Sequence, residues 1–311
     1  MTQPALIALD WGTSSLRAWL LDGEGRAIEA RQAPLGLMQV EGRDFAAAFD
    51  AVAGGWRGRW PGLPALASGM IGAAQGWVEA PYIPCPAGAE DLGRRLARVA
   101  ERALFIVPGV IQRDPANVMR GEETQVFGAL ALRPDLAGAR LVLPGTHSKW
   151  VTLKGGRIAG FETWMTGELF AVLKGHSILG RFARDGAAPA APEEGAAAFR
   201  AGVLAARAAG RASGLYFSAR ARVLAGELAP GAALDHLSGL LIGEELAAAL
   251  GDRPGAAPLV LIGDPALSAR YRTALALFGA EVAAEIPEAA VAGLWQVARA
   301  AGLVAPAGET T

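Results

Sequence analysis

Few features of this 311-residue sequence mark a secreted, membrane-bound or nucleic-acid-binding protein. Cys85 is the single cysteine, so an internal disulfide framework is excluded and a reducing compartment is favoured. No apolar run is long enough to cross a bilayer, and the first residues lack the basic segment, apolar run and cleavage site of a signal peptide. We therefore expect a cytoplasmic protein with no membrane partner.

The chain also lacks an excess of either charge. Its 29 Lys and Arg residues and 30 Asp and Glu residues give a net charge of −1, which argues against a nucleic-acid partner because such a partner needs a clustered positive field. Apolar material is plentiful: 52% of the residues are hydrophobic and 19% are charged, which is enough for a packed core. The length favours two domains.

The first half of the chain has the pattern of a mixed α/β unit. A proline-rich passage at 80–86 cannot be a central strand, because proline removes a ladder hydrogen bond. The order of the predicted strands and helices indicates a sheet with an antiparallel edge, which parallel strands joined by crossover connections continue. The predicted elements are two strands flanking a polar turn within 6–20, a strand near 26–31, a helix at 44–60, a strand at 64–68, a helix at 91–102 and a strand at 103–110.

The second half begins to repeat this order. A helix at 122–132 and a strand at 140–143 lead into a Gly/Thr/Ser turn at 145–149, and two more strands follow. A supersecondary unit that occurs twice predicts two related lobes with a cleft between them. The remaining predicted elements are helices at 167–174, 195–209, 214–228, 235–250, 266–278 and 287–301, with short strands beginning near 259 and 281.

The polar turn within 6–20 has the composition of a phosphate-binding site. Asp10 ends the first strand, and Gly12, Thr13 and Ser14 form the turn. Backbone N–H groups and the two hydroxyls can point at an anion above the turn, while Asp10 holds a hydrated Mg²⁺ beside it. Phosphate together with magnesium indicates a nucleotide. The alternative is an ordinary β-hairpin with a polar turn.

Longer motifs, spread over nearly the whole chain, resemble the 2-dehydro-3-deoxygalactonokinase family. They are residues 9–17, 68–72, 75–82, 108–114, 119–125, 143–150 and 165–169. The paired Gly/Thr/Ser turns also resemble the ATPase domain shared by sugar kinases, Hsp70, hexokinase and actin. The resemblance implies an α/β fold of two ribonuclease H-like lobes, each a mixed sheet flanked by helices, with the active site in the cleft between the lobes.

The resemblance also implies a division of labour. Residues 1–118 are expected to form an N-terminal lobe that binds the sugar acid and phosphate, and residues 119–311 a C-terminal lobe that binds the nucleotide. The last helix, 287–302, is expected to pack back on the first lobe. The implied reaction is phosphorylation of 2-dehydro-3-deoxy-D-galactonate on O6 in galactonate catabolism, with ATP and Mg²⁺ as cofactors.

In such an enzyme two turns hold the phosphates. The resemblance implies the amides of Gly12, Thr13 and Ser14 from one lobe, and those of Gly145, Thr146 and His147 from the other. Lys149 would add a point charge, or it is a solvated strand residue. His147 is alternatively a turn residue without a ligand role. Gly263 and Asp264 belong to the segment expected to contact adenosine, where glycine allows close approach of the purine.

Phosphoryl transfer also needs a base and a substrate pocket. We expect Glu122 to be the base, with Glu123 and Asp114 as the next candidates. Acidic residues in a first helical turn are, alternatively, common because they suit the helix dipole. The candidates for contact with the sugar acid are Arg17, Arg113 and Arg120 for its carboxylate, and Ser68, Gly69, Met70, Gln75 and Trp77, of which Trp77 is alternatively core packing.

Three other functions remain open at this stage. The same fold could hydrolyse phosphoanhydrides in the manner of exopolyphosphatases, with water in place of the sugar hydroxyl. The enzyme could phosphorylate another 2-keto-3-deoxy sugar acid. An actin-like or chaperone ATPase is disfavoured because those proteins carry extra subdomains. The oligomeric state is open, with a homodimer as one alternative.

Overall fold

The computed structural model describes residues 3–210, 212–251 and 257–305. The chain forms two units that are dense in internal contacts. The first takes Met1–Gly138, Val151–Phe161 and Glu288–Thr311, and the second takes Ala139–Trp150 and Glu162–Pro287. The first continuous segment of the first unit therefore ends at Gly138, whereas the N-terminal lobe was expected to end at residue 118. Among the described helices, none combines the length and the apolar content needed to cross a membrane.

The first unit is built on a six-stranded mixed sheet with the strand order β3-β2-β1-β4-β7-β6. β1 pairs with β2, and β2 with β3, in antiparallel fashion, whereas β1, β4 and β7 run parallel. This confirms the predicted antiparallel edge continued by parallel crossovers. The strands are β1 (Pro4–Trp11), β2 (Leu16–Asp22), β3 (Ala27–Ala33), β4 (Ala65–Ser68), β6 (Ala97–Val99) and β7 (Leu104–Ile106).

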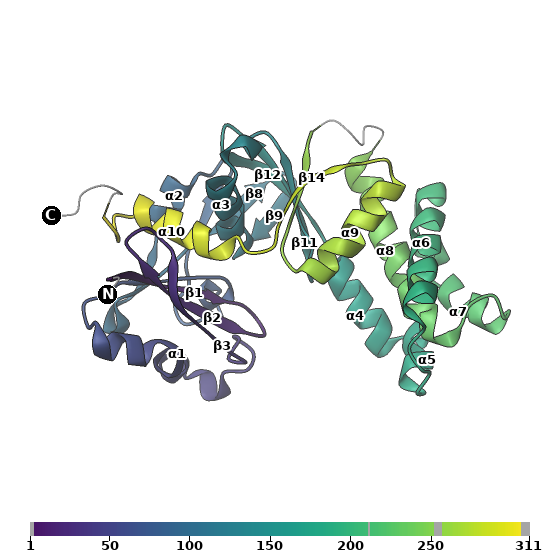
Figure 1. The fold of residues 1–311 in the computed structure, drawn as a ribbon, viewed down its shortest axis with the longest axis horizontal. Coiled ribbons are helices and arrows are strands. Elements are labelled where there is room, and N and C mark those ends of the chain that lie inside the picture. The colour runs from purple at the N-terminus through teal and green to yellow at the C-terminus, as the bar shows by residue number, and fades with distance from the viewer. Residues whose placement is uncertain (1–2, 211, 252–256, 306–311) are drawn as a thin grey trace. The chain divides into compact units, whose positions relative to one another are not determined.

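Helix α1 (Phe45–Arg59) covers one face of this sheet, and α10 (Ala290–Ala300) lies on the other (Figure 1). The Asp44 carboxylate caps α1 by accepting a hydrogen bond from the Ala47 amide at 2.9 Å. The apolar stripe of α1 includes Phe49 and Trp56, both fully buried against the sheet. Burial of each such side chain stabilises the fold by roughly 1.5–3 kcal/mol, so this stripe fixes α1 on the sheet.

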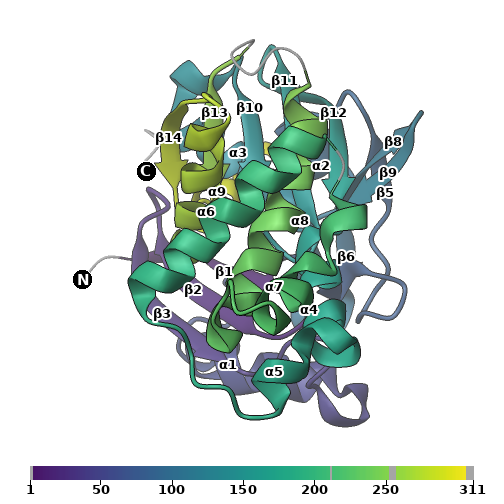
Figure 2. The same cartoon turned by 90° about the vertical axis from the view of Figure 1, so that its right-hand side faces the viewer.

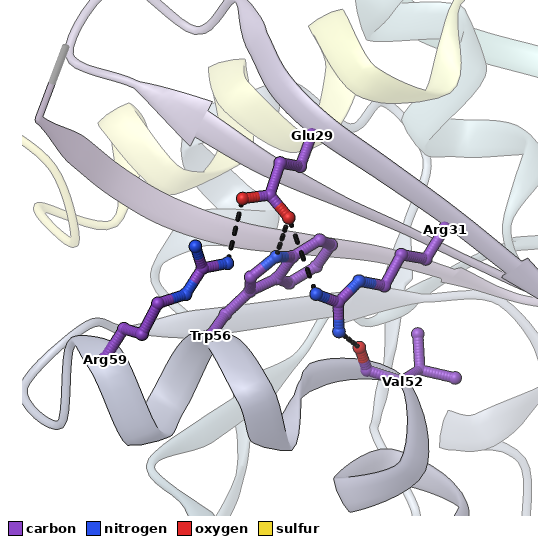
Figure 3. A network of polar contacts seen from close by, with 5 residues as sticks. All are labelled: Glu29, Arg31, Val52, Trp56 and Arg59. Carbon is purple, nitrogen blue, oxygen red and sulfur yellow. Dashed lines mark hydrogen bonds and ion pairs between the residues drawn. The ribbon is translucent and has the colours of Figure 1, made fainter. Parts of the chain in front are cut away.

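A polar cluster on β3 also attaches α1 (Figure 3). The Glu29 carboxylate accepts hydrogen bonds from Trp56 Nε1 at 2.7 Å and from Arg59 at 2.8 Å. Arg31 lies 4.3 Å from the Trp56 ring and donates to the Val52 carbonyl oxygen at 2.8 Å. The Trp56 hydrogen bond, followed by that of Arg59, lowers the pKa of Glu29. The outermost strand of this end of the sheet is thereby tied to the helix.

Helix α10 packs against α3 (Glu122–Leu132), α2 (Ala89–Gly93), β1 and β4. Two glycines allow the closest approach, since a Cβ on Gly128 would lie 1.8 Å from the Ala289 carbonyl oxygen and one on Gly293 would lie 1.8 Å from that of Thr124. The helices α3 and α10 therefore meet backbone to backbone. The bounds of α3 agree with the predicted helix at 122–132.

A small sheet completes the first unit, with the strand order β5-β8-β9. The proline-rich passage forms β5 (Tyr82–Pro84) at the edge of this sheet, beside β8 (Gly109–Arg113) and β9 (Ala116–Met119), as its prolines require. The predicted helix at 91–102 is wrong, because α2 ends at Gly93 and β6 pairs in antiparallel fashion with β7. The predicted strand at 103–110 is two strands, β7 and β8, in different sheets.

The second sheet has the order β12-β11-β10-β13-β14, which matches β3-β2-β1-β4-β7 position by position and agrees with the predicted repeat. β10, β13 and β14 run parallel. The predicted α/β class with mixed sheets flanked by helices is confirmed. The strands are β10 (Arg140–Leu143), β11 (Ser148–Lys154), β12 (Arg157–Trp164), β13 (Leu259–Ile262) and β14 (Val282–Ile286).

Helices make up most of the second unit. Figure 2 shows α6 lying across α8, and a Cβ on Gly239 of α8 would lie 2.1 Å from the Phe199 carbonyl oxygen of α6, so the two backbones touch. The predicted helix at 214–228 is shorter, since α7 is confined to Ser218–Leu224. The helices are α4 (Thr166–His176), α5 (Arg181–Arg184), α6 (Pro192–Ala209), α7, α8 (Ala233–Leu250) and α9 (Pro265–Leu277).

Candidate active site

In the first unit the candidate site lies at the carboxyl ends of two parallel strands. Asp10 of β1 pairs in register with Ser68 of β4, so the two residues lie side by side. Gly69 follows with φ of +96°, and a Cβ there would lie 2.7 Å from the Trp11 carbonyl oxygen and 3.6 Å from Asp10 Oδ1. Only glycine tolerates both this conformation and this contact. The strand ends therefore hold Asp10 beside the Ser68-Gly69 loop.

The start of α3 reaches the same place. Gly121 precedes the helix with φ of +105°, and a Cβ on Gly121 would lie 3.2 Å from the Gly69 Cα. Glu122, the first residue of α3, is thus brought close to the strand ends that hold Asp10. The fold of the first unit therefore gathers four of the predicted site residues, namely Asp10, Ser68, Gly69 and Glu122.

The neighbouring glutamates of α3 have different environments. Glu122 is half-buried, and its Oε2 accepts a hydrogen bond from the Arg120 amide at 3.0 Å. Glu123 is fully buried, and its two carboxylate oxygens accept from the Gly121 amide at 2.9 and 2.8 Å. Burial, with a smaller contribution from the charge of Glu122, raises the pKa of Glu123 to about 8. Of the two, only Glu122 has surface that a substrate could reach.

The three candidate arginines also differ. Arg17 pairs with Asp10 Oδ2 at 2.5 Å and Glu288 Oε1 at 3.0 Å; burial opposes its charge, but these carboxylates raise its pKa. Arg120 is 9% exposed, donates to the Ala80 carbonyl oxygen at 2.8 Å, and has no hydrogen-bond partner for Nε or Nη1 among the described residues. Arg113 is exposed at the end of β8.

The first Gly/Thr/Ser turn is only partly available to a ligand. The Gly12 amide donates to the Ser15 carbonyl oxygen at 3.0 Å, so this N–H group is already used within the turn. Thr13 and Ser14 are exposed. The segment after β3 braces the turn, because Met38 donates its amide hydrogen to the Thr13 carbonyl oxygen at 3.1 Å. Thr13 and Ser14 are therefore the turn residues open to an anion.

The remaining candidates in the first unit either pack in the core or are exposed. The Trp77 ring packs 6.2 Å from Trp11 and 6.0 Å from Phe49, centroid to centroid, and so belongs to the aromatic part of the core. Met70 packs against the same core. Gln75 is exposed, as is Asp114 in the turn after β8. Contact of any of these four residues with a substrate stays a prediction.

In the second unit, the turn after β10 is packed against the start of α4. A Cβ on Gly167 would lie 2.4 Å from the Gly145 carbonyl oxygen, and the Glu168 amide donates to the Thr146 carbonyl oxygen at 2.9 Å. His147 Nε2 lies 2.5 Å from Glu168 Oε2. Thr146 and His147 are exposed on this turn.

Lys149 is not a solvated strand residue. It is 4% exposed, and its Nζ donates to Thr163 Oγ1 at 2.8 Å. Its neighbours on β11, Ser148 and Trp150, are buried as well, so both faces of the strand are covered at this point. A buried ammonium beside a Gly/Thr turn is a candidate for charge neutralisation near a phosphate.

A cavity of about 320 Å³ opens beside this turn within the second unit. Gly145, α4, α8 and α9 line it. Its walls are mostly apolar, with a few polar groups, which is the composition of a site for a small organic ligand. The apolar residues are Phe170, Leu234, Leu241, Ile242 and Leu267, and the polar ones are Thr166, Asp235, Ser238, Arg270 and Tyr271.

The adenosine segment is predicted at 261–267, and it borders this cavity through Leu267. Gly263 and Asp264 do not line the cavity. Asp264 instead caps α9, since its Oδ1 accepts from the Leu267 amide at 2.8 Å, and the Gly263 amide donates to the Ile286 carbonyl oxygen at 3.2 Å. Sequence reasoning missed the cavity residues of α8. Their signal was Asp235 and Ser238 among the apolar residues of the first half of the helix.

The described residues include no group of three His, Cys, Asp or Glu side chains that could hold a metal ion. A single carboxylate, that of Asp10, is nevertheless the donor set expected for nucleotide-bound Mg²⁺, which takes most of its ligands from phosphates and water. Asp10 is half-buried at a strand end, where its Oδ2 is paired with Arg17 at 2.5 Å, and a single carboxylate in this position fits an ion that takes its other ligands from phosphate and water.

Comparison with known proteins identifies the family. The model of the 2-keto-3-deoxy-galactonokinase family matches residues 10–297. The chain belongs to this family. Its match includes both turns, the start of α3 and every residue that lines the cavity.

Comparison with individual relatives agrees with the assignment of this chain to the 2-keto-3-deoxy-galactonokinase family. The chain is 40% identical to the probable 2-dehydro-3-deoxygalactonokinase of Rhizobium meliloti strain 1021, over 94% of this chain and 96% of the relative. It is 37% identical to the 2-dehydro-3-deoxygalactonokinase of Escherichia coli strain K12, over 94% and 97%. A crystal structure from Sinorhizobium meliloti, assigned as a 2-dehydro-3-deoxygalactonokinase, matches with a TM-score of 0.84 and 38% identity over 95% of this chain and 98% of that one.

Proposed function

We propose that the protein transfers the γ-phosphoryl group of ATP to the 6-hydroxyl of 2-dehydro-3-deoxy-D-galactonate. The family match over residues 10–297 supports this proposal, and it includes the candidate residues of both units. Phosphoryl transfer asks a protein mainly to position two substrates and neutralise charge. The two units contain separate groups of residues suited to these tasks.

The second unit would hold the nucleotide. Its cavity of about 320 Å³ is large enough for a nucleoside, and its apolar walls suit a purine. Gly145 lines the cavity and begins the turn that carries the exposed Thr146 and His147, so phosphates attached to the nucleoside would reach that turn. Buried Lys149 would neutralise part of their charge.

The first unit would contribute Asp10, Thr13 and Ser14. The exposed turn residues Thr13 and Ser14 offer donors to the phosphates. Asp10 would hold Mg²⁺, which neutralises phosphate charge when bound. The Arg17 guanidinium, paired with Asp10 at 2.5 Å, keeps that carboxylate in place at the strand end.

Glu122 is our candidate for the base that takes the proton from the attacking hydroxyl. It is half-buried at the start of α3, close to the strand end that carries Asp10, whereas Glu123 has no exposed surface and Asp114 lies in a turn elsewhere. A carboxylate in this position can accept the proton as the new bond forms.

Arg120 is our first candidate for recognition of the substrate carboxylate. Two of its N–H-bearing nitrogens, Nε and Nη1, have no hydrogen-bond partner among the described residues, whereas Arg17 is engaged by two carboxylates. A buried guanidinium with unused donors favours a carboxylate ligand. Its neighbours Ala80 and Gly72 belong to the motifs that we expected to contact the sugar acid.

A coupled ADP-release assay over a panel of 2-keto-3-deoxy sugar acids, with water alone as the blank, tests the proposal. We expect turnover that depends on the sugar acid and is fastest with the galactonate-series compound. Fastest turnover with a gluconate-series acid would reassign the substrate. Phosphate release of equal rate with and without sugar acid would refute the kinase and favour a hydrolase of the exopolyphosphatase type.

A further inference from the structure

One carboxylate in the second unit joins four elements. Glu245 of α8 is 1% exposed, and its Oε1 accepts a hydrogen bond from Trp150 Nε1 at 2.7 Å. Its Oε2 accepts one from the Tyr271 hydroxyl at 2.7 Å and another from the Thr166 hydroxyl. These donors belong to β11, α9 and α4. Glu245 is thus a shared acceptor for three elements besides its own helix.

The network continues toward the turn after β10. Ser148 Oγ lies 2.7 Å from the Tyr271 hydroxyl oxygen. Because the Tyr271 hydroxyl donates its hydrogen to Glu245, Ser148 is the donor in this pair. Ser148, the first residue of β11, directly follows the exposed residues Thr146 and His147, so the end of the turn is held by the same network.

The network also supports the cavity without entering it. Thr166 and Tyr271 line the cavity, as do Leu241 and Ile242, which lie one turn before Glu245 on α8. Glu245 itself does not line the cavity. Its side chain therefore lies behind the wall and bonds two of the polar residues that face inward.

Thr166 links this wall to the turn. It is the first residue of α4, and the next two residues dock on the turn: Gly167 touches the Gly145 carbonyl oxygen, and the Glu168 amide donates to Thr146 at 2.9 Å. A buried hydroxyl that loses its acceptor must find another or move. Loss of Glu245 as acceptor would therefore release the start of α4, and with it both the wall and the turn.

We propose that Glu245 is a positioning residue of the nucleotide site, which fixes Thr166 and Tyr271 on the cavity wall and, through the start of α4, fixes the turn at Gly145 and Thr146. This inference rests on the proposed function, since it takes the cavity as the nucleoside pocket. It concerns binding of the nucleotide only, because every residue of the network belongs to the second unit.

Calorimetric titration with a nonhydrolysable ATP analogue and, separately, with the sugar acid tests the proposal. We compare wild type, Glu245→Gln, Thr166→Val and the double variant. The glutamine keeps the shape of the side chain but presents an NH₂ group to donors, so we expect Glu245→Gln to weaken analogue binding by about tenfold, which is about 1.4 kcal/mol. We expect sugar-acid affinity to stay unchanged.

The double variant decides whether Thr166 acts through Glu245. If it does, the double variant binds the analogue about as weakly as Glu245→Gln alone; independent contacts would instead give additive losses. A Leu275→Val variant, which shortens a fully buried side chain outside the cavity wall, controls for general destabilisation of the second unit and should bind both ligands normally.

Three results would overturn the inference. They are wild-type analogue affinity in Glu245→Gln, additive losses in the double variant, and an equal loss of analogue and sugar-acid binding. Absence of analogue binding by the wild-type protein is a distinct outcome, because it would overturn the proposed function and this inference together.

Discussion

The replacement of Glu123 by glutamine tests whether Glu123 has a structural role, in contrast to the catalytic role that we propose for its neighbour Glu122. Glu123 is fully buried, and its carboxyl group accepts hydrogen bonds from the Gly121 amide at 2.9 and 2.8 Å. A glutamine side chain at this position would have the same shape and could still accept from that amide. The variant therefore removes the ionisable group while it leaves most of the packing in place.

The effect on stability depends on pH in a defined direction. The pKa of Glu123 is about 8 in the folded protein and near its ordinary 4.5 when unfolded, so the folded state holds this proton more tightly. Protonation therefore stabilises the fold fully below about pH 4.5, and this contribution is lost as pH rises through about 8. Between about pH 5.5 and about pH 8.5, the loss is about 3 kcal/mol.

Urea denaturation at these two pH values, read by tryptophan fluorescence, measures the effect. We expect the difference in free energy of unfolding between wild type and Glu123→Gln to shift by about 3 kcal/mol in favour of the variant as pH rises. A Glu101→Gln variant at an exposed position of the same unit controls for the loss of one carboxylate. A difference that is the same at both pH values would refute the reasoning.

Three further predictions follow from the candidate site. Asp10→Asn should fold normally by circular dichroism but lose turnover by orders of magnitude, since it removes the charge that would hold the metal ion; wild-type activity would contradict this. Glu122→Gln should lower kcat far more than it raises KM in steady-state kinetics, and the opposite pattern would exclude it as the base. Gly69→Ala should cost about 1–3 kcal/mol of stability in thermal unfolding, because Gly69 has φ of +96° and the new Cβ would lie 2.7 Å from the Trp11 carbonyl oxygen. The control is Gly62→Ala, which has open space around it and should cost less than about 0.5 kcal/mol.

Local signals predicted much of the fold. Gly121 and the acidic first turn that follows it marked the start of α3, and the observed helix spans the predicted residues. Alternation of strands and small-residue turns predicted both sheets, including the parallel crossovers from β1 to β4 and β7. The prediction at 91–102 failed because β6 pairs with β7, the next strand along the chain, and this pairing overrides the helical pattern of that segment.

The site was predicted less completely than the fold. Glu122 and Glu123 are indistinguishable in a sequence, but successive residues of a helix are rotated by about 100°, so Glu122 is half-buried and Glu123 is fully buried. The cavity combines residues from α4, α8 and α9, which lie far apart in the chain and have no common spacing. Tyr271 and Glu245 could not have been paired without the packing of α8 against α9.

Identification of the phosphorylated product tests the central claim most directly. Phosphorus NMR of a reaction that contains the protein, ATP, Mg²⁺ and 2-dehydro-3-deoxy-D-galactonate should show a new phosphomonoester signal coupled to the C6 methylene protons, growing in step with ADP. A spectrum in which ADP forms together with inorganic phosphate alone, or in which ATP persists, would contradict the account.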